Sequence, residues 1–196
     1  MSLVKAKKHL GQHFLTDKNI AEKIVNSLQA SSQYNQVLEV GPGMGILSDF
    51  LLGKKDLETY LIDIDTESYE FLKKKYPDLG ARLINGDFLE LDFATVFPGK
   101  FGIIGNFPYN ISSQILFKVL DNRNQVVELV GMFQKEVAQR CAEKPGSKEY
   151  GILSVFLQAF YKVEYLFSVK PGVFNPPPKV TSAVIRLTRN DVEKLN

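Results

Sequence analysis

The sequence is poor in the residues that cross-link small proteins or bind structural metals. It has one cysteine, Cys141, among 196 residues, which excludes an internal disulfide framework. One cysteine and two histidines also cannot supply the closed ligand set of a structural zinc site. We interpret Cys141 as a small packing residue on a helix. We therefore expect a protein of the reducing cytoplasm that binds no metal.

The sequence also has no long apolar run and no strong net charge. No stretch is apolar enough over about 20 residues to cross a bilayer, and the first residues lack the basic, apolar and small-residue order of a signal peptide. We therefore expect no membrane partner. The net charge of +2 neither favours nor excludes a nucleic-acid partner.

Positive charge is nevertheless concentrated at the amino terminus. Lys5, Lys7 and Lys8 stand with His9 in an opening stretch that contains no acid. Such a segment can contact phosphates, although a solvated chain end has the same composition. We interpret residues 1–16 as a basic amino-terminal arm.

The rest of the chain has the pattern of a globular α/β domain, with 44% hydrophobic and 23% charged residues. Short apolar runs alternate with stretches of helical periodicity, which predicts a parallel sheet covered on both faces. The last two runs have no helix between them and are expected to pair antiparallel. Strands are expected at 37–40, 57–62, 82–84, 101–104, 126–133, 163–169 and 180–187. Over residues 17–196 this layout predicts the Rossmann-like class I methyltransferase fold, a seven-stranded mostly parallel sheet with an antiparallel edge hairpin.

Helices are expected between these strands, and polar residues mark where two of them begin. Apolar spacing predicts a helix from Asp17 to about Gln29, with Thr16 or Asp17 as its cap. Another helix follows the fourth strand, with Ser112 or Ser113 as its cap. Further helices are expected at 47–52, 66–76, 134–143 and 151–160.

A glycine-rich loop follows the first strand of the predicted sheet. Glu39, Gly41, Gly43 and Gly45 form the pattern E-x-G-x-G-x-G. Glycines at such a turn adopt positive φ and let a ligand approach the backbone. A nicotinamide-binding loop would require a third glycine where Ile46 stands. The pattern instead resembles the S-adenosylmethionine loop, the alternative being a tight turn without a ligand.

Acidic residues end the next two predicted strands. Asp63 stands where an acid can accept both hydroxyls of a ribose. Asp87 can accept from an adenine amino group, with Phe88 against the ring. Each acid alone is more often a loop or cap residue, but the two together indicate a cofactor site. We also assign Ile64 and Asn106 to this site.

A second motif, Asn106-Phe107-Pro108-Tyr109, follows the fourth strand and resembles the [DNS]-P-P-[YF] tetrapeptide of methyltransferases that modify exocyclic amino groups. Adenine N6 is a poor nucleophile because its lone pair is delocalised into the ring. Two acceptors, the Asn106 side-chain oxygen and a backbone carbonyl near Phe107 or Pro108, would bind its hydrogens and free the lone pair. Pro108 stiffens the loop and Tyr109 can stack on the base. The expected catalysis therefore rests on positioning and electrostatics.

These motifs, with further segments, make the chain similar to a known family. The segments are Gly11-Gln12-His13-Phe14-Leu15, Asn106 to Ser112, Gln134-Lys135-Glu136-Val137, and Phe174 to Val184. From Lys8 to about Arg189 the chain resembles the ribosomal RNA small-subunit adenine N6,N6-dimethyltransferases of the KsgA type. The intact last segment favours this group over related enzymes that act on large-subunit rRNA.

The resemblance implies an activity and roles for further residues. It implies dimethylation, from S-adenosyl-L-methionine, of two adjacent adenosines near the 3′ end of small-subunit (16S) rRNA, linked to ribosome biogenesis. Gln12, His13 and Leu15 would lie over the cofactor. Phe174 would form the second face of an aromatic sandwich with Tyr109. The implied protein is a monomer whose partner is this rRNA in the immature 30S subunit.

One departure concerns the end of the chain. Family members continue into a small helical domain that helps hold the RNA, whereas this sequence ends at Asn196. We expect a truncated catalytic domain that binds cofactor and is weakened on the ribosome. Two other functions stay open: a non-catalytic RNA-binding factor of ribosome assembly, and an adenine N6-methyltransferase acting on large-subunit rRNA or DNA.

Overall fold

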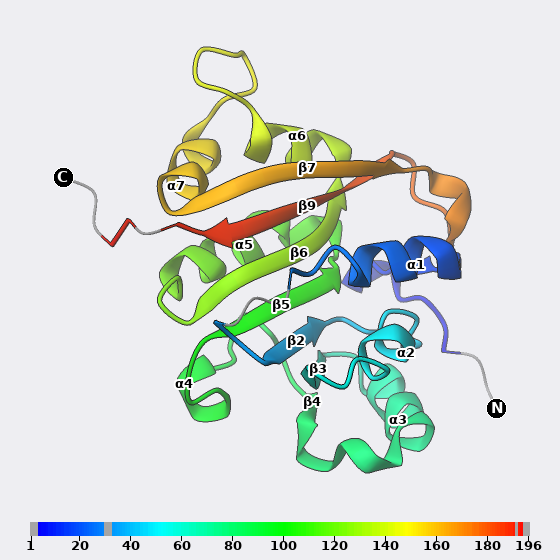
Figure 1. Ribbon diagram of the computed structural model, residues 1–196. Helices are drawn as coiled ribbons and strands as arrows, with labels where there is room; N and C mark the ends of the chain where they lie inside the picture. Colours follow the sequence, from blue (N-terminus) through cyan, green and yellow to red (C-terminus); the bar gives the residue numbers. More distant parts are fainter. Residues whose placement is uncertain (1–3, 30–32, 191, 194–196) are drawn as a thin grey trace.

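A seven-stranded sheet forms the centre of the protein (Figure 1). The computed structural model describes residues 4–29, 33–190 and 192–193. In spatial order the strands are β4 (Leu83–Asn85), β3 (Glu58–Asp63), β2 (Gln36–Val40), β5 (Phe101–Asn106), β6 (Val126–Gln134), β9 (Ser182–Arg189) and β7 (Tyr161–Val169). Neighbours from β4 to β6 pair parallel, and β9 pairs antiparallel with β6 and β7. The predicted sheet is confirmed, with β7 at its edge and β9 one position inside.

Helices connect the strands, and most of them were expected from the sequence. They are α1 (Lys18–Val25), α2 (Ser48–Leu51), α3 (Thr66–Lys75), α4 (Phe93–Val96), α5 (Ser112–Asp121), α6 (Lys135–Ala142) and α7 (Ile152–Phe160). Short 3-10 turns are η1 (Lys8–Leu10), η2 (Pro77–Arg82), η3 (Tyr109–Ile111) and η4 (Pro171–Val173). Within the described ranges, no helix combines the length and the apolar character needed to cross a membrane.

The sheet has a hydrophobic core on each face. Successive strand residues point to opposite faces, so Ile103 packs on the side of α5, α6 and α7 while Ile104 packs on the side of α1 and α2. A smaller cluster contains Leu72 of α3. Cys141 is fully buried in the first core, as expected for a packing residue. Burial raises the pKa of its thiol to about 12.

The helix starts agree with the sequence in one case and differ in another. The Asp17 carboxylate caps α1 by accepting from the backbone N–H groups two and three residues further on, at 2.9 and 3.1 Å. The serine cap expected for α5 is wrong. The chain enters α5 directly from η3, so Ser112 is already helical and its Oγ donates to the carbonyl of Tyr109 at 3.0 Å.

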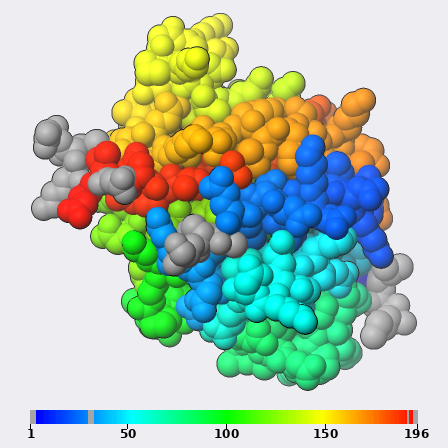
Figure 2. All heavy atoms as spheres, in the orientation of Figure 1, coloured from blue at the N-terminus to red at the C-terminus, as the bar shows by residue number. Residues whose placement is uncertain are grey.

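A second, two-stranded sheet ties the amino-terminal segment to the segment before β9. β1 (Phe14–Leu15) pairs antiparallel with β8 (Phe174–Asn175), and Leu15 stands opposite Phe174. Thr16 strengthens this connection because its backbone N–H donates to the carbonyl of Val173 at 2.8 Å. Figure 2 shows the blue residues near position 20 between the cyan residues near position 50 and the orange residues near position 165.

Candidate active site

A cavity lies at the carboxyl ends of β2, β3, β4 and β5, where parallel α/β sheets bind ligands. Eleven of the predicted site residues line it: Gln12, His13, Gly41, Gly43, Asp63, Ile64, Asp87, Phe88, Asn106, Pro108 and Tyr109. Leu15 and Glu39 line an adjoining hollow, to which Gly41 and Asn106 also contribute. The amino-terminal motif and the ends of four strands therefore meet in one place.

Sequence reasoning missed part of the cavity wall. His9, which the sequence assigns to the basic arm, lines the cavity together with Leu10. Leu89 and Asn110 line it as well. Leu89 and Asn110 stand within two residues of predicted positions, so a wider window around each motif would have included them. Leu10 stands two residues before Gln12, so the same wider window would have included it.

The glycine loop has the backbone geometry expected from its sequence. Gly41, Gly43 and Gly45 have φ values of 66°, 58° and 80°. At Gly43 a side chain is also excluded by space, because a Cβ there would lie 2.7 Å from the Phe14 ring. At Gly41 a Cβ would meet no atom within 4 Å, so open space lies beside its backbone. The loop thus presents bare backbone to the cavity.

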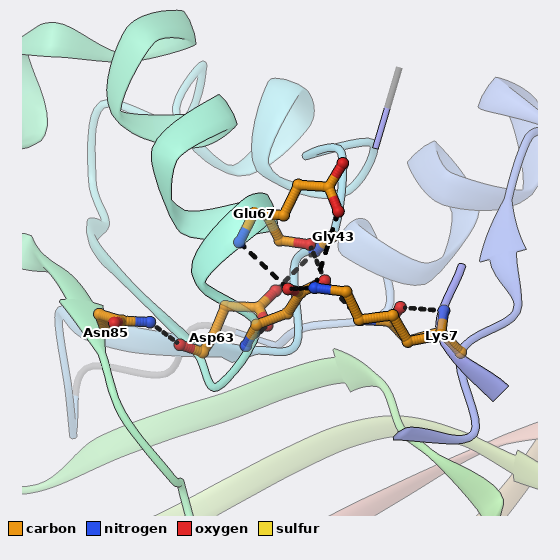
Figure 3. Close-up of polar contacts among 8 residues, drawn as sticks. Lys7, Gly43, Asp63, Glu67 and Asn85 are labelled. Atoms are coloured by element: carbon orange, nitrogen blue, oxygen red, sulfur yellow. Dashed lines mark hydrogen bonds and ion pairs between the residues drawn. The ribbon is translucent and has the colours of Figure 1, made fainter. Parts of the chain in front are cut away.

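Asp63 is held rigidly at the end of β3 (Figure 3). One carboxylate oxygen accepts from the backbone N–H of Gly43 at 3.1 Å, and the other accepts from that of Asp65 at 2.9 Å. The Asn85 side chain donates to the Asp63 carbonyl at 3.0 Å. Burial raises the pKa of the Asp63 carboxyl to about 6, against the opposing effect of the two backbone donors. Asp63 is therefore a fixed acceptor whose charge changes near neutral pH.

Asp87 and its neighbours form the wall after β4. The Asp87 carboxylate accepts from the backbone N–H of Leu89 at 2.8 Å. Lys118 of α5 holds this segment by donating to the carbonyls of Leu89 and Leu91, each at 2.8 Å. The Phe88 ring is buried, whereas Ile64 across the cavity wall is 52% exposed. The exposed Ile64 side chain can pack on a flat ring, and the Asp87 carboxylate can accept hydrogen bonds from polar groups on that ring.

Glu39 lies behind the glycine loop and is almost fully buried. Its carboxyl accepts from Ser48 Oγ at 2.6 Å. Burial raises the pKa of Glu39 to about 8, with the Ser48 hydrogen bond opposing the shift. Glu39 is therefore protonated around neutral pH, and it supports the loop from the side of the adjoining hollow.

Asn106 ends β5 with its side-chain amide in a defined orientation. Its Nδ2 donates to the carbonyl of His13 at 2.8 Å. Because a carbonyl can only accept, the nitrogen of the amide must face His13 and the oxygen must point elsewhere. The Asn106 oxygen therefore keeps its capacity to accept a hydrogen bond in the cavity.

Phe107 anchors the tetrapeptide in the core, where it is 1% exposed. Its ring lies over two glycines that face each other across β5 and β6, Gly105 and Gly131. A Cβ on Gly131 would lie 2.3 Å from the Phe107 ring, and a Cβ on Gly105 would lie 2.9 Å from it. The backbone N–H of Phe107 also donates to the carbonyl of Met132 at 3.1 Å. Because neither glycine has a side chain, the Phe107 ring packs directly on the backbone of β5 and β6, and this contact fixes the position of the loop relative to the sheet.

Tyr109 has an aromatic neighbour, but it differs from the expected one. Its ring stacks on that of His13, with centroids 5.5 Å apart and planes 28° apart. Its hydroxyl is hydrogen-bonded to Ser182 Oγ at 2.5 Å. His13 Nδ1 donates to the carbonyl of Pro176 at 2.8 Å, which fixes the imidazole ring.

The expected sandwich of Tyr109 with Phe174 is therefore corrected. Phe174 is 4% exposed in β8 and packs in the core that contains Leu15. Phe174 also lines neither the cavity nor the adjoining hollow, whereas Phe88, which is equally buried, does line the cavity. The sequence places Phe174 correctly before the proline-rich loop, but the pairing of β8 with β1 turns its side chain inward.

Comparison with known proteins identifies the family of this chain. The family model described as ribosomal RNA adenine dimethylase matches residues 3–195. The ribosomal RNA small subunit methyltransferase A of Cytophaga hutchinsonii is 61% identical over 97% of this chain and 74% of its own length. The protein of the same name from Parabacteroides distasonis is 55% identical over 100% of this chain and 73% of its own length.

Solved structures have the same fold. A dimethyladenosine transferase from Plasmodium falciparum superimposes with a TM-score of 0.78 at 33% identity, over 91% of this chain and 64% of that protein. The 23S rRNA methyltransferase ErmE superimposes with a TM-score of 0.80 at 27% identity, over 93% of this chain and 72% of that protein. With the family model matching nearly the whole sequence, the chain belongs to the ribosomal RNA adenine dimethylase family.

Proposed function

We propose that the chain transfers methyl groups from S-adenosyl-L-methionine to N6 of two adjacent adenosines near the 3′ end of small-subunit (16S) rRNA. The observation that carries this proposal is the Asn106 amide, which the His13 carbonyl orients with its oxygen free at the cavity. The names of the two relatives, both small-subunit methyltransferases, favour this target over large-subunit rRNA and DNA. The same names favour an enzyme over a non-catalytic assembly factor.

The residues present fit the cofactor. The open space beside Gly41 admits a ligand against the loop backbone. Asp63 accepts from the ribose hydroxyls, and Asp87 accepts from the adenine amino group. Ile64 and Phe88 contact the adenine ring, while Gln12 and His13 cover the cofactor from the amino-terminal side. S-adenosylmethionine supplies a methyl group on a positively charged sulfur.

The tetrapeptide prepares the target nitrogen. Asn106 Oδ1 and a backbone carbonyl near Phe107 or Pro108 accept the two hydrogens of N6 and localise its lone pair. Tyr109 stacks on the base, a contact worth about 1–3 kcal/mol. In each transfer N6 would form a bond to the methyl carbon as the carbon–sulfur bond breaks with its electron pair going to sulfur, and N6 would then release one hydrogen as a proton to solvent. These residues act by positioning and by fixed dipoles, so the reaction requires no protein nucleophile.

The proposed setting is that of a monomer in the cytoplasm acting on the immature 30S subunit. Its test is incubation with methyl-labelled S-adenosylmethionine and unmethylated small subunits, followed by digestion and identification of labelled nucleosides. We expect N6,N6-dimethyladenosine in two adjacent positions near the 3′ end. Parallel incubations with large-subunit rRNA and with DNA test the alternatives: label there and none in the small subunit would identify a different substrate. Cofactor binding without label on any of these nucleic acids would contradict the enzymatic proposal.

Cofactor affinity is expected to fall as the pH drops below about 6. The carboxyl of Asp63 has a pKa raised to about 6 by burial, and its ionised form accepts from the ribose. Binding therefore favours the deprotonated state, and well below this pKa the affinity falls about tenfold per pH unit. The folding stability of the ligand-free protein depends on pH in the opposite sense. It rises as the pH falls through about 6, because protonation of Asp63 removes the cost of burying its charge.

Calorimetric titration with S-adenosylhomocysteine from pH 5 to pH 8 measures this dependence. The matched control is Asp63→Asn, which keeps the shape and cannot ionise. We expect weaker binding by this variant at pH 8, without the Asp63-dependent fall below pH 6. Equal pH profiles for the two proteins would show that Asp63 does not cause the dependence.

A further inference from the structure

One continuous segment forms a wall of the cavity without belonging to the main sheet. We call residues Lys7–Phe14 the cover segment, since its residues from His9 to Phe14 all line the cavity. It contains the short turn η1 and enters β1, which pairs only with the two-residue strand β8 in the described structure. Its position over the strand ends must therefore depend largely on side-chain contacts.

Lys7, Gln12 and Asp65 form a ring of contacts that attaches the cover segment to the start of α3. Lys7 Nζ forms an ion pair with one oxygen of Asp65, and Gln12 Nε2 donates to the other at 3.2 Å. The backbone N–H of Lys7 donates to Gln12 Oε1 at 2.8 Å, which closes the ring of contacts. Glu67 Oε2 lies 3.6 Å from Lys7 Nζ and adds a second negative charge. Figure 3 shows Lys7 extending toward Glu67 above the end of β3 at Asp63.

Asp65 is a rigid attachment point for these contacts. It is buried, it caps α3 by accepting from the backbone N–H of Glu67 at 3.1 Å, and it accepts from Ser68 Oγ at 3.1 Å. Burial opposes its ionisation, but hydrogen bonds from Lys7, Gln12, the Glu67 backbone and Ser68 together outweigh that effect and hold the pKa of Asp65 below its ordinary value. The carboxylate thus stays charged and binds the cover segment through two partners.

The same contacts lead directly to the cofactor acceptor. The backbone N–H of Asp65 donates to Asp63, whose other carboxylate oxygen accepts from Gly43. A side chain of the cover segment, the acceptor Asp63 and the glycine loop are therefore joined through Asp65. Loss of the Lys7 ammonium would leave a buried carboxylate short of its cationic partner, which favours entry of water and opening of the segment.

We propose that Lys7 is a positioning residue: through its ion pair with Asp65 it holds the cover segment closed over the cavity and slows release of the cofactor. The proposal rests on the proposed function, because it takes the ligand of this cavity to be S-adenosylmethionine. It also assigns the charge of Lys7 to a contact within the protein, whereas the sequence left open both contact with phosphates and a solvated chain end.

The test compares Lys7→Met with Lys8→Met, which removes the same charge from an exposed neighbouring side chain. Titration with S-adenosylhomocysteine gives Kd, and displacement in a stopped-flow instrument gives the release rate. We expect Lys7→Met to raise both about tenfold, within the range typical of energetic coupling between sites. Lys8→Met is expected to change them less than about twofold, and Lys7→Arg to restore most of the wild-type behaviour because it keeps the ion pair.

A second readout separates positioning from general stability. Lys7 is a partly exposed residue outside the cores, so the Tm of the ligand-free protein is expected to shift by less than about 2 °C in Lys7→Met. In turnover, KM for S-adenosylmethionine should rise while kcat stays unchanged. Wild-type Kd and release rate in Lys7→Met, or equal weakening by Lys8→Met, would overturn the proposal. Failure of the wild-type protein to bind S-adenosylhomocysteine would instead overturn the proposed function on which it rests.

Discussion

Replacing Asn106 with alanine is expected to lower kcat by about 10²- to 10³-fold, the range typical of removing one preorganised polar group from an active site. The Asn106 amide is held by the His13 carbonyl, which leaves its oxygen available for the acceptor role that we propose toward a hydrogen of N6. Alanine removes that acceptor without disturbing β5, whose backbone pairing does not involve the side chain. Single-turnover methyl transfer with saturating cofactor measures the effect on chemistry alone.

Asn106→Asp is the matched variant for this prediction. It keeps an acceptor oxygen of the same reach, but it cannot donate to the carbonyl of His13. We expect a rate between those of the wild type and the alanine variant, with Kd for S-adenosylhomocysteine changed by less than about fivefold in both, since the acceptor acts mainly in the transition state. An alanine variant that retains wild-type kcat would show that another group accepts the N6 hydrogens.

Replacing Gly131 with alanine is expected to destabilise the fold and to displace the loop of residues 106–109, which we propose to be catalytic. The new Cβ would lie 2.3 Å from the Phe107 ring and 2.8 Å from that of Phe133, distances at which atoms must move. Overpacking of this kind costs about 1–3 kcal/mol of unfolding free energy. Because Phe107 stands between Asn106 and Pro108, a shift of its ring also moves the acceptors, and a misplacement of about 1 Å can cost about 100-fold in rate.

Urea unfolding and single-turnover kinetics measure the two effects separately. Gly99→Ala is the control, since a Cβ at that exposed glycine would meet no atom within 4 Å. A Gly131→Ala, Phe107→Leu double variant makes room for the added methyl group and should recover part of the stability lost in the single variant. Additive losses in the double variant would show that Phe107 does not take up the strain.

The fold and much of the cavity wall could be predicted because both follow from local patterns. Alternation of apolar runs with helical periodicity determines a parallel sheet, and parallel strands end at the same edge. Asp63 and Asp87 end neighbouring strands β3 and β4, so their presence at one cavity follows from the order of the strands. The positive φ of Gly41 and Gly43 follows equally from residue type.

Contacts between distant segments could not be predicted in this way. β1 and β8 are each two residues long, too short for a periodic signal, yet their pairing buries Phe174 and leaves His13 as the ring beside Tyr109. The ion pair of Lys7 with Asp65 joins residues 58 positions apart, and composition alone cannot distinguish it from a solvated charge. The start of α5 was misplaced because η3 runs into it without a break.

The hydrogen bond between Asn106 and position 13 has a consequence for how this enzyme family can diverge. The acceptor is a main-chain carbonyl, which every amino acid supplies. Orientation of the Asn106 amide is therefore insulated from mutation of residue 13, whereas the imidazole ring beside Tyr109 is not. A substitution at position 13 would therefore change the aromatic neighbour of Tyr109 while the Asn106 amide keeps its alignment.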